Sequence, residues 1–396
     1  MKLAGRVAKV KPSETLAITA KANALRAQGR DVIGFGAGEP DFDTPDHIKK
    51  AAIQAIEAGF TKYTPVGGTD ELKDAIIRKL YVDNHLEYKR SQIVVSCGAK
   101  HSLYNLAQAL FEEGDEVIIP SPYWVSYPDI VLLAGGTPVI VQTLEQDGFK
   151  MKPEQLKAAI TRRTKAVILN GPSNPTGAAY SPEELKALAA VLADTDVYVI
   201  SDDIYEKILY ANFSFANIAM VDPGLKERTI VVNGVSKAYA MTGWRIGYAA
   251  GPENIITAME NVQSQSTSNP TSISQVAAEA ALNGDQGCIT PMVKAFRERH
   301  EFVVSELNRI PGLSCLKAGG AFYAFPDARQ AITTLHAKGT IKEATDLAFS
   351  EYLLVQAGVA VVPGSAFGSE GYIRLSFATS MENLKNALER IAKALA

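Results

Sequence analysis

The stretch SKAYAMTGWRIGYAAG, residues 236–251, places Lys237 and Arg245 among small, apolar and aromatic residues. Segments of that composition are usually buried in folded proteins. The apolar run TIVVNG comes shortly before Lys237, so this lysine stands just after an expected strand. A lysine there could serve as a Schiff-base amine whose pKa is lowered by burial or by a neighbouring cation. Taken alone, a lysine after a strand is more often exposed to solvent.

Three further apolar runs end in residues that could do chemistry. After QIVVS, the turn CGAK at residues 97–100 enters an expected helix, where free backbone N–H groups could hold a phosphate. After KAVILN, the turn GPSNPTG could aim the side-chain amide of Asn174. After VYVIS come Asp202 and Asp203, and a buried carboxylate there would favour a cationic partner. Each signal alone also fits a plain turn or a solvated strand end.

Together the four strand ends offer a phosphate cradle, an amide, a carboxylate and an amine. Ligands of open α/β sheets collect outside the carboxyl ends of the strands, where these groups would meet. They are the groups that pyridoxal 5′-phosphate requires from a protein. The sequence therefore predicts a site for this cofactor at one edge of a sheet.

The elements that must position these residues alternate along the chain. Strands are expected at QIVVS, DEVIIP, TPVIVQ, KAVILN, VYVIS, TIVVNG and RIGYAAG. Helices are expected between them, at HSLYNLAQALFEEG and at SPEELKALAAVLAD, which opens with Ser181 as N-cap, Pro182 in the first turn and Glu184. This alternation predicts a βαβ domain with a largely parallel sheet.

The C-terminal part predicts a smaller domain. It contains the helical patterns VKAFRERHEFVVSELNRI and MENLKNALERIAKALA and the strands VAVVPG and YIRLSFA. We therefore expect an α/β fold, with a large domain whose mostly parallel sheet lies between helices, and a smaller α+β domain built from both chain ends. The expected divisions are an N-terminal arm at 1–12, a large cofactor-binding domain at 46–292, and a small domain at 13–45 and 293–396.

Composition narrows the classes of partner. The 396 residues are 47% hydrophobic and 21% charged, with a net charge of −3, so no basic excess points to nucleic acid. No apolar run reaches the roughly 18 residues that span a bilayer, and the N-terminus lacks a signal-peptide pattern, so a cytoplasmic protein is expected. Three cysteines without Cys-x-x-Cys spacing and five scattered histidines predict neither a disulfide framework nor a metal site.

Six segments carry a resemblance to a known family: SKAYAMTGWRIGY, NGPSNPTG, SDDIYE, SPYWVSYP, AGEPDFDTP and YTPVGGTDELK. They resemble the class I aminotransferases of pyridoxal-phosphate fold type I, especially the bacterial aspartate aminotransferases, and the resemblance runs almost end to end. It implies transfer of the amino group of L-aspartate to 2-oxoglutarate, giving oxaloacetate and L-glutamate. It also implies a homodimer with shared active sites that acts on small amino acids and 2-oxo acids.

The resemblance assigns cofactor roles to individual residues. Lys237 would bind the cofactor covalently and then move the proton of the substrate's α-carbon. Asp202 would pair with the pyridine nitrogen, and Trp124 would stack on the ring. Tyr205 and Asn174 would donate hydrogen bonds to the ring oxygen O3′. The phosphate would be held by Ser236, Arg245 and the backbone N–H groups of Ala99 and Lys100, and by Tyr63 of the neighbouring subunit.

The resemblance also places the substrate. Arg374 in YIRLSFA would grip the α-carboxylate with two parallel hydrogen bonds, helped by the backbone of Gly38 and beside Trp124 and Asn174. Lys100 would face the side-chain carboxylate of aspartate. Lys11 matches a lysine associated with prephenate as a second amino acceptor. Position 234, a serine in some relatives, is Gly234 in this chain, so one hydroxyl contact to the phosphate is missing.

Three other functions fit parts of the pattern. A nicotinamide-dependent dehydrogenase fails on spacing, because GFGAGEP lacks the Gly-x-Gly-x-x-Gly order and runs into a proline. A regulator that binds the cofactor without catalysis would be expected to carry a basic DNA-binding extension, which this chain lacks. A β-lyase of the same fold remains the nearest alternative.

Overall fold

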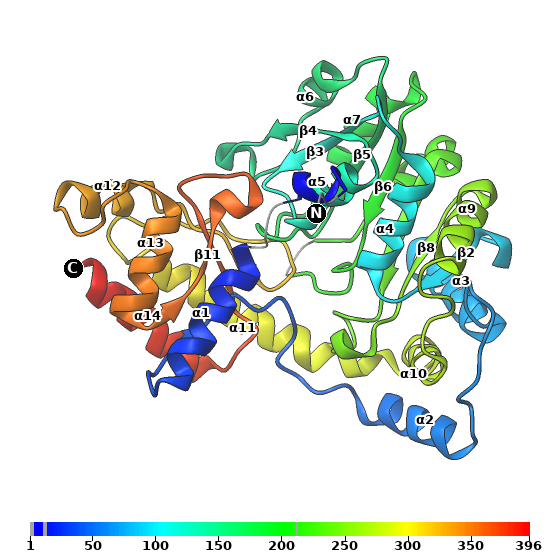
Figure 1. Ribbon diagram of the computed structural model, residues 1–396, viewed down its shortest axis with the longest axis horizontal. Coiled ribbons are helices and arrows are strands. Elements are labelled where there is room, and N and C mark those ends of the chain that lie inside the picture. The colour runs from blue at the N-terminus through cyan, green and yellow to red at the C-terminus, as the bar shows by residue number, and fades with distance from the viewer. Residues whose placement is uncertain (1–3, 11–13, 211–212) are drawn as a thin grey trace.

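A seven-stranded sheet forms the centre of the molecule in the computed structural model, which describes residues 4–10, 14–210 and 213–396 (Figure 1). Its strand order is β2-β8-β7-β6-β5-β3-β4, and only β8 runs antiparallel to its neighbours. The strands are β2 (Ile93–Ser96), β3 (Glu116–Ser121), β4 (Thr137–Gln142), β5 (Thr164–Asn170), β6 (Tyr198–Asp202), β7 (Thr229–Gly234) and β8 (Gly247–Ala250). The seven predicted strands and the largely parallel sheet are confirmed.

Helices cover both faces of this sheet. Val94 of β2 packs with α4, α5 and α9, whereas its neighbours Ile93 and Val95 pack on the opposite face. This alternation follows from the two-residue period of a strand. The helices of this part of the chain are α2 (Asp46–Glu57), α3 (Asp70–Asn84), α4 (Ala99–Leu110), α5 (Ser126–Leu133), α6 (Pro153–Ala159), α7 (Pro182–Ala193), α8 (Ile218–Val221), α9 (Glu253–Ser264) and α10 (Ser272–Asn283). Helix α2 packs against α10. Every position of β7 is buried, as expected for a central strand covered on both faces.

Local sequence signals begin the helices where they were expected. At α7 the Ser181 hydroxyl accepts a hydrogen bond from the Glu184 N–H, and the Glu184 carboxylate accepts one from the Ser181 N–H. This reciprocal pair satisfies two donors that a helix start would otherwise leave without partners. Helix α4 buries Leu103, Leu106 and Ala107 on one face, and Leu110 is half-buried.

The C-terminal part forms a second group of elements. Strands β9 (Tyr323–Ala324), β11 (Val362–Pro363) and β12 (Ile373–Ser376) make a three-stranded sheet, and β1 (Ile33–Gly34) pairs with β10 (Val359–Ala360). The β1–β10 pairing brings residues from both ends of the chain together, in agreement with the expected composition of the smaller domain; the exact domain limits stay a prediction. The helices of this part are α1 (Glu14–Ala27), α11 (Ile289–Leu307), α12 (Arg329–Ala337), α13 (Asp346–Tyr352) and α14 (Met381–Leu395).

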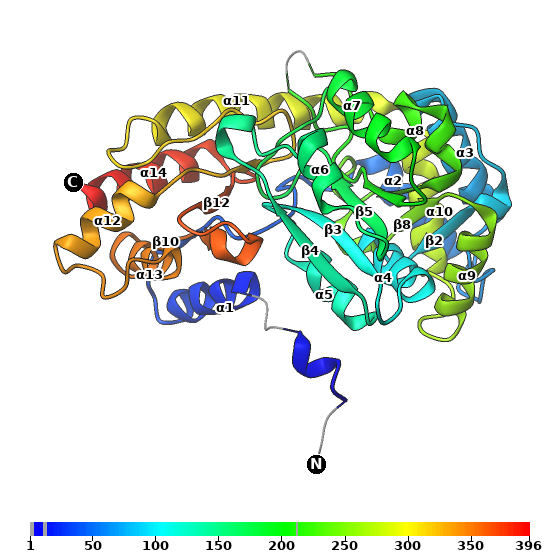
Figure 2. The same ribbon diagram turned by 90° about the horizontal axis from the view of Figure 1, so that it is seen from above.

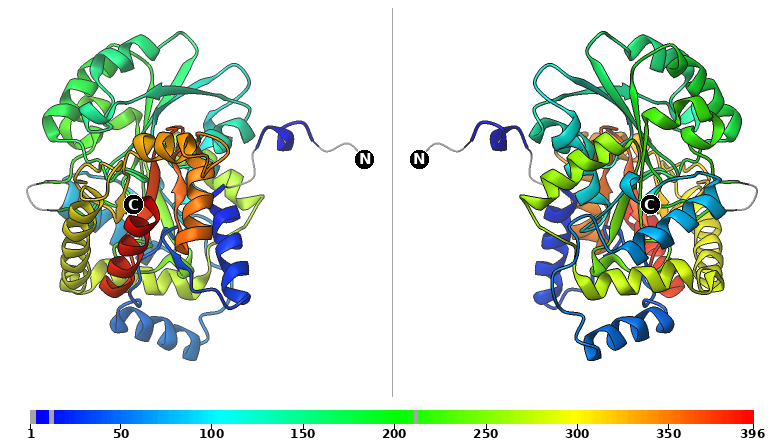
Figure 3. Two further views of the ribbon diagram at one scale, coloured as in Figure 1. Left: turned by 90° about the vertical axis from the view of Figure 1, so that its left-hand side faces the viewer. Right: turned by 90° about the vertical axis from the view of Figure 1, so that its right-hand side faces the viewer.

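The views from other sides show how the two groups join. Helix α11 runs along one side of the molecule and reaches α14 in the C-terminal part (Figure 2). Helix α2 lies at the edge of the molecule in both views of Figure 3. Of the helices in the described part of the chain, none combines the length and apolar character needed to cross a membrane.

Candidate active site

Three neighbouring strands bring the predicted site residues to one edge of the sheet. Strands β5, β6 and β7 are adjacent and parallel, so their carboxyl ends meet. Asn174 follows β5, Asp202 ends β6, and Lys237 follows β7. The sequence order of these residues thus becomes a cluster in space.

Lys237 is largely buried at the centre of this cluster. Its Nζ donates a 2.5 Å hydrogen bond to the carbonyl oxygen of Gly38, which follows β1. Burial lowers the pKa of Lys237 to about 8; the carboxylate of Glu39 opposes this shift, and the cations Arg245 and Arg374 add to it. An amine with such a pKa is neutral in a useful fraction near physiological pH, which nucleophilic attack on a carbonyl requires.

A cradle for a phosphate lies at the start of α4. The guanidinium of Arg245 donates to the carbonyl oxygens of Thr242 at 2.8 Å and of Cys97 at 3.4 Å. A Cβ on Gly98 would lie 2.3 Å from Arg245 Nη2, and the φ of +94° at this position favours glycine. No side chain caps the helix at Gly98, and the N–H groups of Ala99 and Lys100 have no hydrogen-bond partner among the described residues. A helix N-terminus beside an arginine suits a bound phosphate.

Asp202 is fully enclosed and fixed by neighbours. The Tyr127 hydroxyl donates a 2.6 Å hydrogen bond to Asp202 Oδ2, and the Ile204 N–H donates one of 3.3 Å to Oδ1. Burial raises the pKa of Asp202 to about 6, although the Tyr127 hydrogen bond and the charge of Lys237 act in the opposite direction. Such a carboxyl is poised to share a proton with a basic ring nitrogen.

Arg374 is a buried cation with neutral partners. It is 3% exposed and donates to the carbonyl oxygen of Gly36 at 2.7 Å and to Asn174 Oδ1 at 3.0 Å. Its Nε has no hydrogen-bond partner among the described residues, and the groups that act on its pKa besides burial are the tyrosines Tyr323 and Tyr205, not carboxylates. A buried charge without a counterion is costly unless a ligand supplies one. The geometry therefore suits a carboxylate ligand.

Aromatic side chains complete the walls. Tyr205 and Tyr323 share a 2.7 Å hydrogen bond between their hydroxyls, and burial raises the pKa of both. Lys100 Nζ lies 4.8 Å from the ring centroid of Trp124, whose ring packs edge-on against Tyr127 at 5.3 Å. Desolvation, and then the charge of Arg245, lower the pKa of Lys100, although the residue as a whole stays exposed.

Comparison with known proteins decides the family. The family described as "Aminotransferase class I and II" matches residues 30–391. The chain belongs to this family. It is 60% identical over 396 residues to the aspartate/prephenate aminotransferase of Nitrosomonas europaea, with all of both chains covered. It is 55% identical to the aspartate aminotransferase of Geobacillus stearothermophilus over 391 residues, which cover 99% of this chain and 98% of the relative.

Solved structures agree with this assignment. The aspartate aminotransferase from Rhizobium meliloti superposes with a TM-score of 0.94 at 49% identity, covering 100% of this chain and 99% of the other. The Thermus thermophilus aspartate aminotransferase with maleate superposes with a TM-score of 0.93 at 44% identity and full coverage of both chains. The predicted family and fold class are thereby confirmed.

Among the described residues, Tyr63 is the predicted residue of the aminotransferase site that is not brought to it within one chain. Tyr63 lies in the loop between α2 and α3 and is 91% exposed, which is unusual for an aromatic side chain. Lys11 lies outside the described residues. The remaining predicted site residues lie on the strand ends, helix start and loops described above.

Sequence reasoning missed two contacts of this aminotransferase site. Tyr127 stands in the motif SPYWVSYP, three residues after Trp124, but only the tryptophan was given a role. Tyr323 stands in GGAFYAF, a segment of the C-terminal part to which no role in the site was given. The first could have been found from its place in a family motif, whereas the second depends on the pairing of β9 with β12, which carries Arg374.

Proposed function

We propose that this chain is a pyridoxal-phosphate-dependent aminotransferase that uses L-aspartate and 2-oxoglutarate and forms oxaloacetate and L-glutamate. The observation that carries the proposal is Arg374, a buried guanidinium that lacks a described counterion and shares a cluster with the buried amine Lys237. Relatives at 60% and 55% identity bear the names aspartate/prephenate and aspartate aminotransferase. A β-lyase of the same fold is less well supported, since those names all describe amino-group transfer.

The residues fit the cofactor by their chemistry. Lys237 would hold it covalently, the start of α4 with Arg245 and Ser236 would bind its phosphate, and Asp202 would keep a proton on its ring nitrogen. When bound, pyridoxal phosphate supplies an electron sink for the negative charge left at the substrate's α-carbon. Lys237 would then remove and return the proton of that carbon, which its lowered pKa favours.

The substrate would be held at its two ends. Arg374 would bind the α-carboxylate with two parallel hydrogen bonds, in place of some of its present neutral partners. Lys100 would face the second carboxylate, which distinguishes aspartate from neutral amino acids. Closure of the smaller domain over this ligand would bring Arg374 toward Lys237 and exclude water.

We further propose a homodimer with shared sites. Helix α2 and the loop after it expose Ile53, Ile56 and Phe60 by 53%, 51% and 40%, next to the 91% exposed Tyr63. Exposed apolar side chains gathered in one segment are typical of an interface. In a dimer, Tyr63 would reach the phosphate held by the neighbouring subunit. Size measurement in solution, with Tyr63→Phe assayed for cofactor affinity, tests this arrangement.

The substrate proposal is tested with a panel of amino donors and acceptors. Aspartate with 2-oxoglutarate should yield oxaloacetate, whereas pyruvate and ammonia released from cystathionine would indicate a β-lyase. Lys100→Ala should lower kcat/KM for aspartate by about 10-fold or more relative to alanine, because it removes a partly desolvated ion pair. An equal loss for both donors would make Lys100 a phosphate-site or structural residue.

Prephenate is proposed as a second amino acceptor. Two relatives, from Nitrosomonas europaea and Cereibacter sphaeroides, are named aspartate/prephenate aminotransferases at 60% and 55% identity. Assay with prephenate and an amino donor tests this activity, and Lys11→Ala should reduce its rate selectively. A wild-type enzyme inactive toward prephenate would remove the proposal.

A further inference from the structure

The turn after β6 has two faces with different surroundings. Asp202 and Tyr205 belong to the candidate active site. Asp203 and Glu206, interleaved with them in the sequence, are buried among polar side chains outside that site. The main partners of Glu206 come from the C-terminal half of α3, so one short turn links the site to a distant helix.

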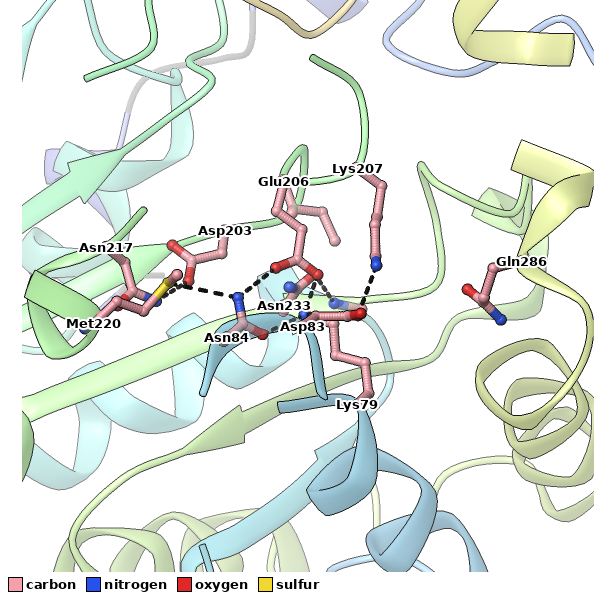
Figure 4. Close-up of polar contacts among 12 residues, drawn as sticks. Lys79, Asp83, Asn84, Asp203, Glu206, Lys207, Asn217, Met220, Asn233 and Gln286 are labelled. Atoms are coloured by element: carbon pink, nitrogen blue, oxygen red, sulfur yellow. Dashed lines mark hydrogen bonds and ion pairs between the residues drawn. The ribbon is translucent and has the colours of Figure 1, made fainter. Parts of the chain in front are cut away.

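The second face contains three side chains that bond to one another. Glu206 and Lys79 form an ion pair while only 6% and 7% exposed. Lys79 Nζ also donates to Asn84 Oδ1 at 2.7 Å, and Asn84 Nδ2 donates to Glu206 Oε2 at 3.1 Å. Figure 4 shows the three side chains converging, with Asp83 beside them joined to Lys207 at 2.6 Å. Lys79 Nζ also lies 3.9 Å from Asp83 Oδ2, so a second carboxylate of α3 borders the set.

Charges on this face are assigned by its contacts. Asp203 accepts hydrogen bonds from Ser201 at 2.6 Å and from Asn217 at 2.7 Å. Burial raises the pKa of Asp203 well above its usual range, the Ser201 hydrogen bond opposes this, and the charge of Glu206 adds to it. Glu206, which contacts Lys79 directly, is the buried counterion of that lysine.

The backbone of the turn is tied to other elements at its two ends. Asp203 N–H bonds to the Val232 carbonyl at 2.8 Å, and Ala321 N–H bonds to the Ile208 carbonyl at 2.9 Å, so both ends are tied to other strands or loops. Among the described residues, the backbone hydrogen bonds of 204–207 stay within the turn. Two side chains next to Tyr205 tie the turn to α3: Glu206 binds Lys79 and Asn84 while buried, and the more exposed Lys207 pairs with Asp83.

We propose that Glu206 is a positioning residue, whose buried contacts with Lys79 and Asn84 hold the turn so that the Tyr205 hydroxyl meets the ring of the cofactor. The inference rests on the proposed function. The same tether would keep the 2.7 Å hydrogen bond between Tyr205 and Tyr323. An electrostatic anchor outside the site would in this way set the geometry of a hydrogen bond inside it.

The test separates positioning from simple stabilisation. Glu206→Gln removes the nearer counterion of Lys79 and leaves Asp83 at 3.9 Å, so the melting temperature should fall. Lys79→Met/Glu206→Met removes both charges of the close pair and should recover much of that loss. In the double variant we still expect the pKa of the cofactor's visible absorbance to shift by about 0.5 or more, and kcat for aspartate to fall about 10-fold with little change in KM, because the hydroxyl is misplaced. A crystal structure of the cofactor-free double variant should show the Tyr205–Tyr323 hydroxyl separation lengthened.

The control is Glu116→Gln. Glu116 is the first residue of β3, whereas the candidate site lies at the carboxyl ends of the strands, and the substitution breaks the ion pair of Glu116 with Arg163. It should change neither the pKa of the cofactor's absorbance nor kcat. A double variant with wild-type absorbance pKa, kcat and hydroxyl separation would overturn the proposal. If the double variant does not fold, a folded Glu206→Gln with an unchanged absorbance pKa overturns it equally. A wild-type protein without transaminase activity, by contrast, would overturn the proposed function.

Discussion

Two buried cations, Lys79 and Arg374, differ in the charge of their partners. They are 7% and 3% exposed. Lys79 lies against the carboxylate of Glu206 and donates to Asn84. Arg374 donates only to the neutral oxygens of Gly36 and Asn174, and its Nε is without a partner in the described part of the chain.

This difference indicates that Lys79 stabilises the fold, whereas Arg374 is available to bind an anionic ligand. Moving a charge out of water costs several kcal/mol unless nearby groups compensate for it. The Glu206 carboxylate offsets this cost for Lys79, whereas Arg374 can still form an ion pair with the carboxylate of a ligand. Lys237 is a third case: its hydrogen-bond acceptor is a neutral carbonyl, and burial lowers its pKa to about 8, so part of the cost is avoided by loss of the charge.

The largest expected effect concerns Lys237. Lys237→Ala should lower the transamination rate by at least about 10⁴-fold, because it removes both the covalent attachment and the proton carrier. Pyridoxal phosphate should still bind, without a covalent bond, through the phosphate cradle. Borohydride reduction followed by peptide mapping checks the attachment point, and a label on any other lysine would refute the assignment.

The free energy of unfolding tests the comparison of the two cations most directly. Lys79→Met should lower the free energy of unfolding by about 3–5 kcal/mol, since it leaves Glu206 buried and unpaired. Arg374→Met should lower the free energy of unfolding of the cofactor-free protein much less, or even raise it, because the substitution removes a buried charge that has no counterion. Denaturant unfolding measures both, and equal losses would show that Arg374 is as important to the fold as Lys79.

Although Arg374→Met should change stability little, it should cause a large loss of activity. Arg374→Met should lower kcat/KM for aspartate by about 10²–10³-fold, through loss of a paired, charge-assisted contact to the α-carboxylate. Arg374→Lys keeps the charge but not the planar fork, and should fall between the two. Steady-state kinetics check this, and a near wild-type Arg374→Met would place the α-carboxylate elsewhere.

The smallest effect concerns pH. Lys237 has a folded pKa of about 8 against its usual 10.5, so between these values the unfolded chain binds more protons than the folded one. Stability contributed by this group therefore rises with pH. From pH 8 to 9.5, cofactor-free wild type should gain about 1–2 kcal/mol relative to Lys237→Met, which does not titrate there. A pH-independent difference would mean that the amine is not desolvated.

Much of the fold was predictable because its signals are local. The seven β-branched runs and the capping residues of α7 each act over a few neighbouring residues, and all are present as predicted. The grouping of Asn174, Asp202 and Lys237 also followed, because the ends of parallel strands share an edge. The family assignment came from motifs, which carry residue identities but no distances.

The sequence by itself determined the strands, the helix starts and the list of residues able to bind a cofactor and a carboxylate. Only the tertiary structure decided that Tyr127 would hold Asp202, that Tyr323 would meet Tyr205, and that Glu206 would be the counterion of Lys79. Each of these contacts joins segments far apart in the chain. No short pattern encodes such pairs, because they depend on how separate elements pack once the chain has folded.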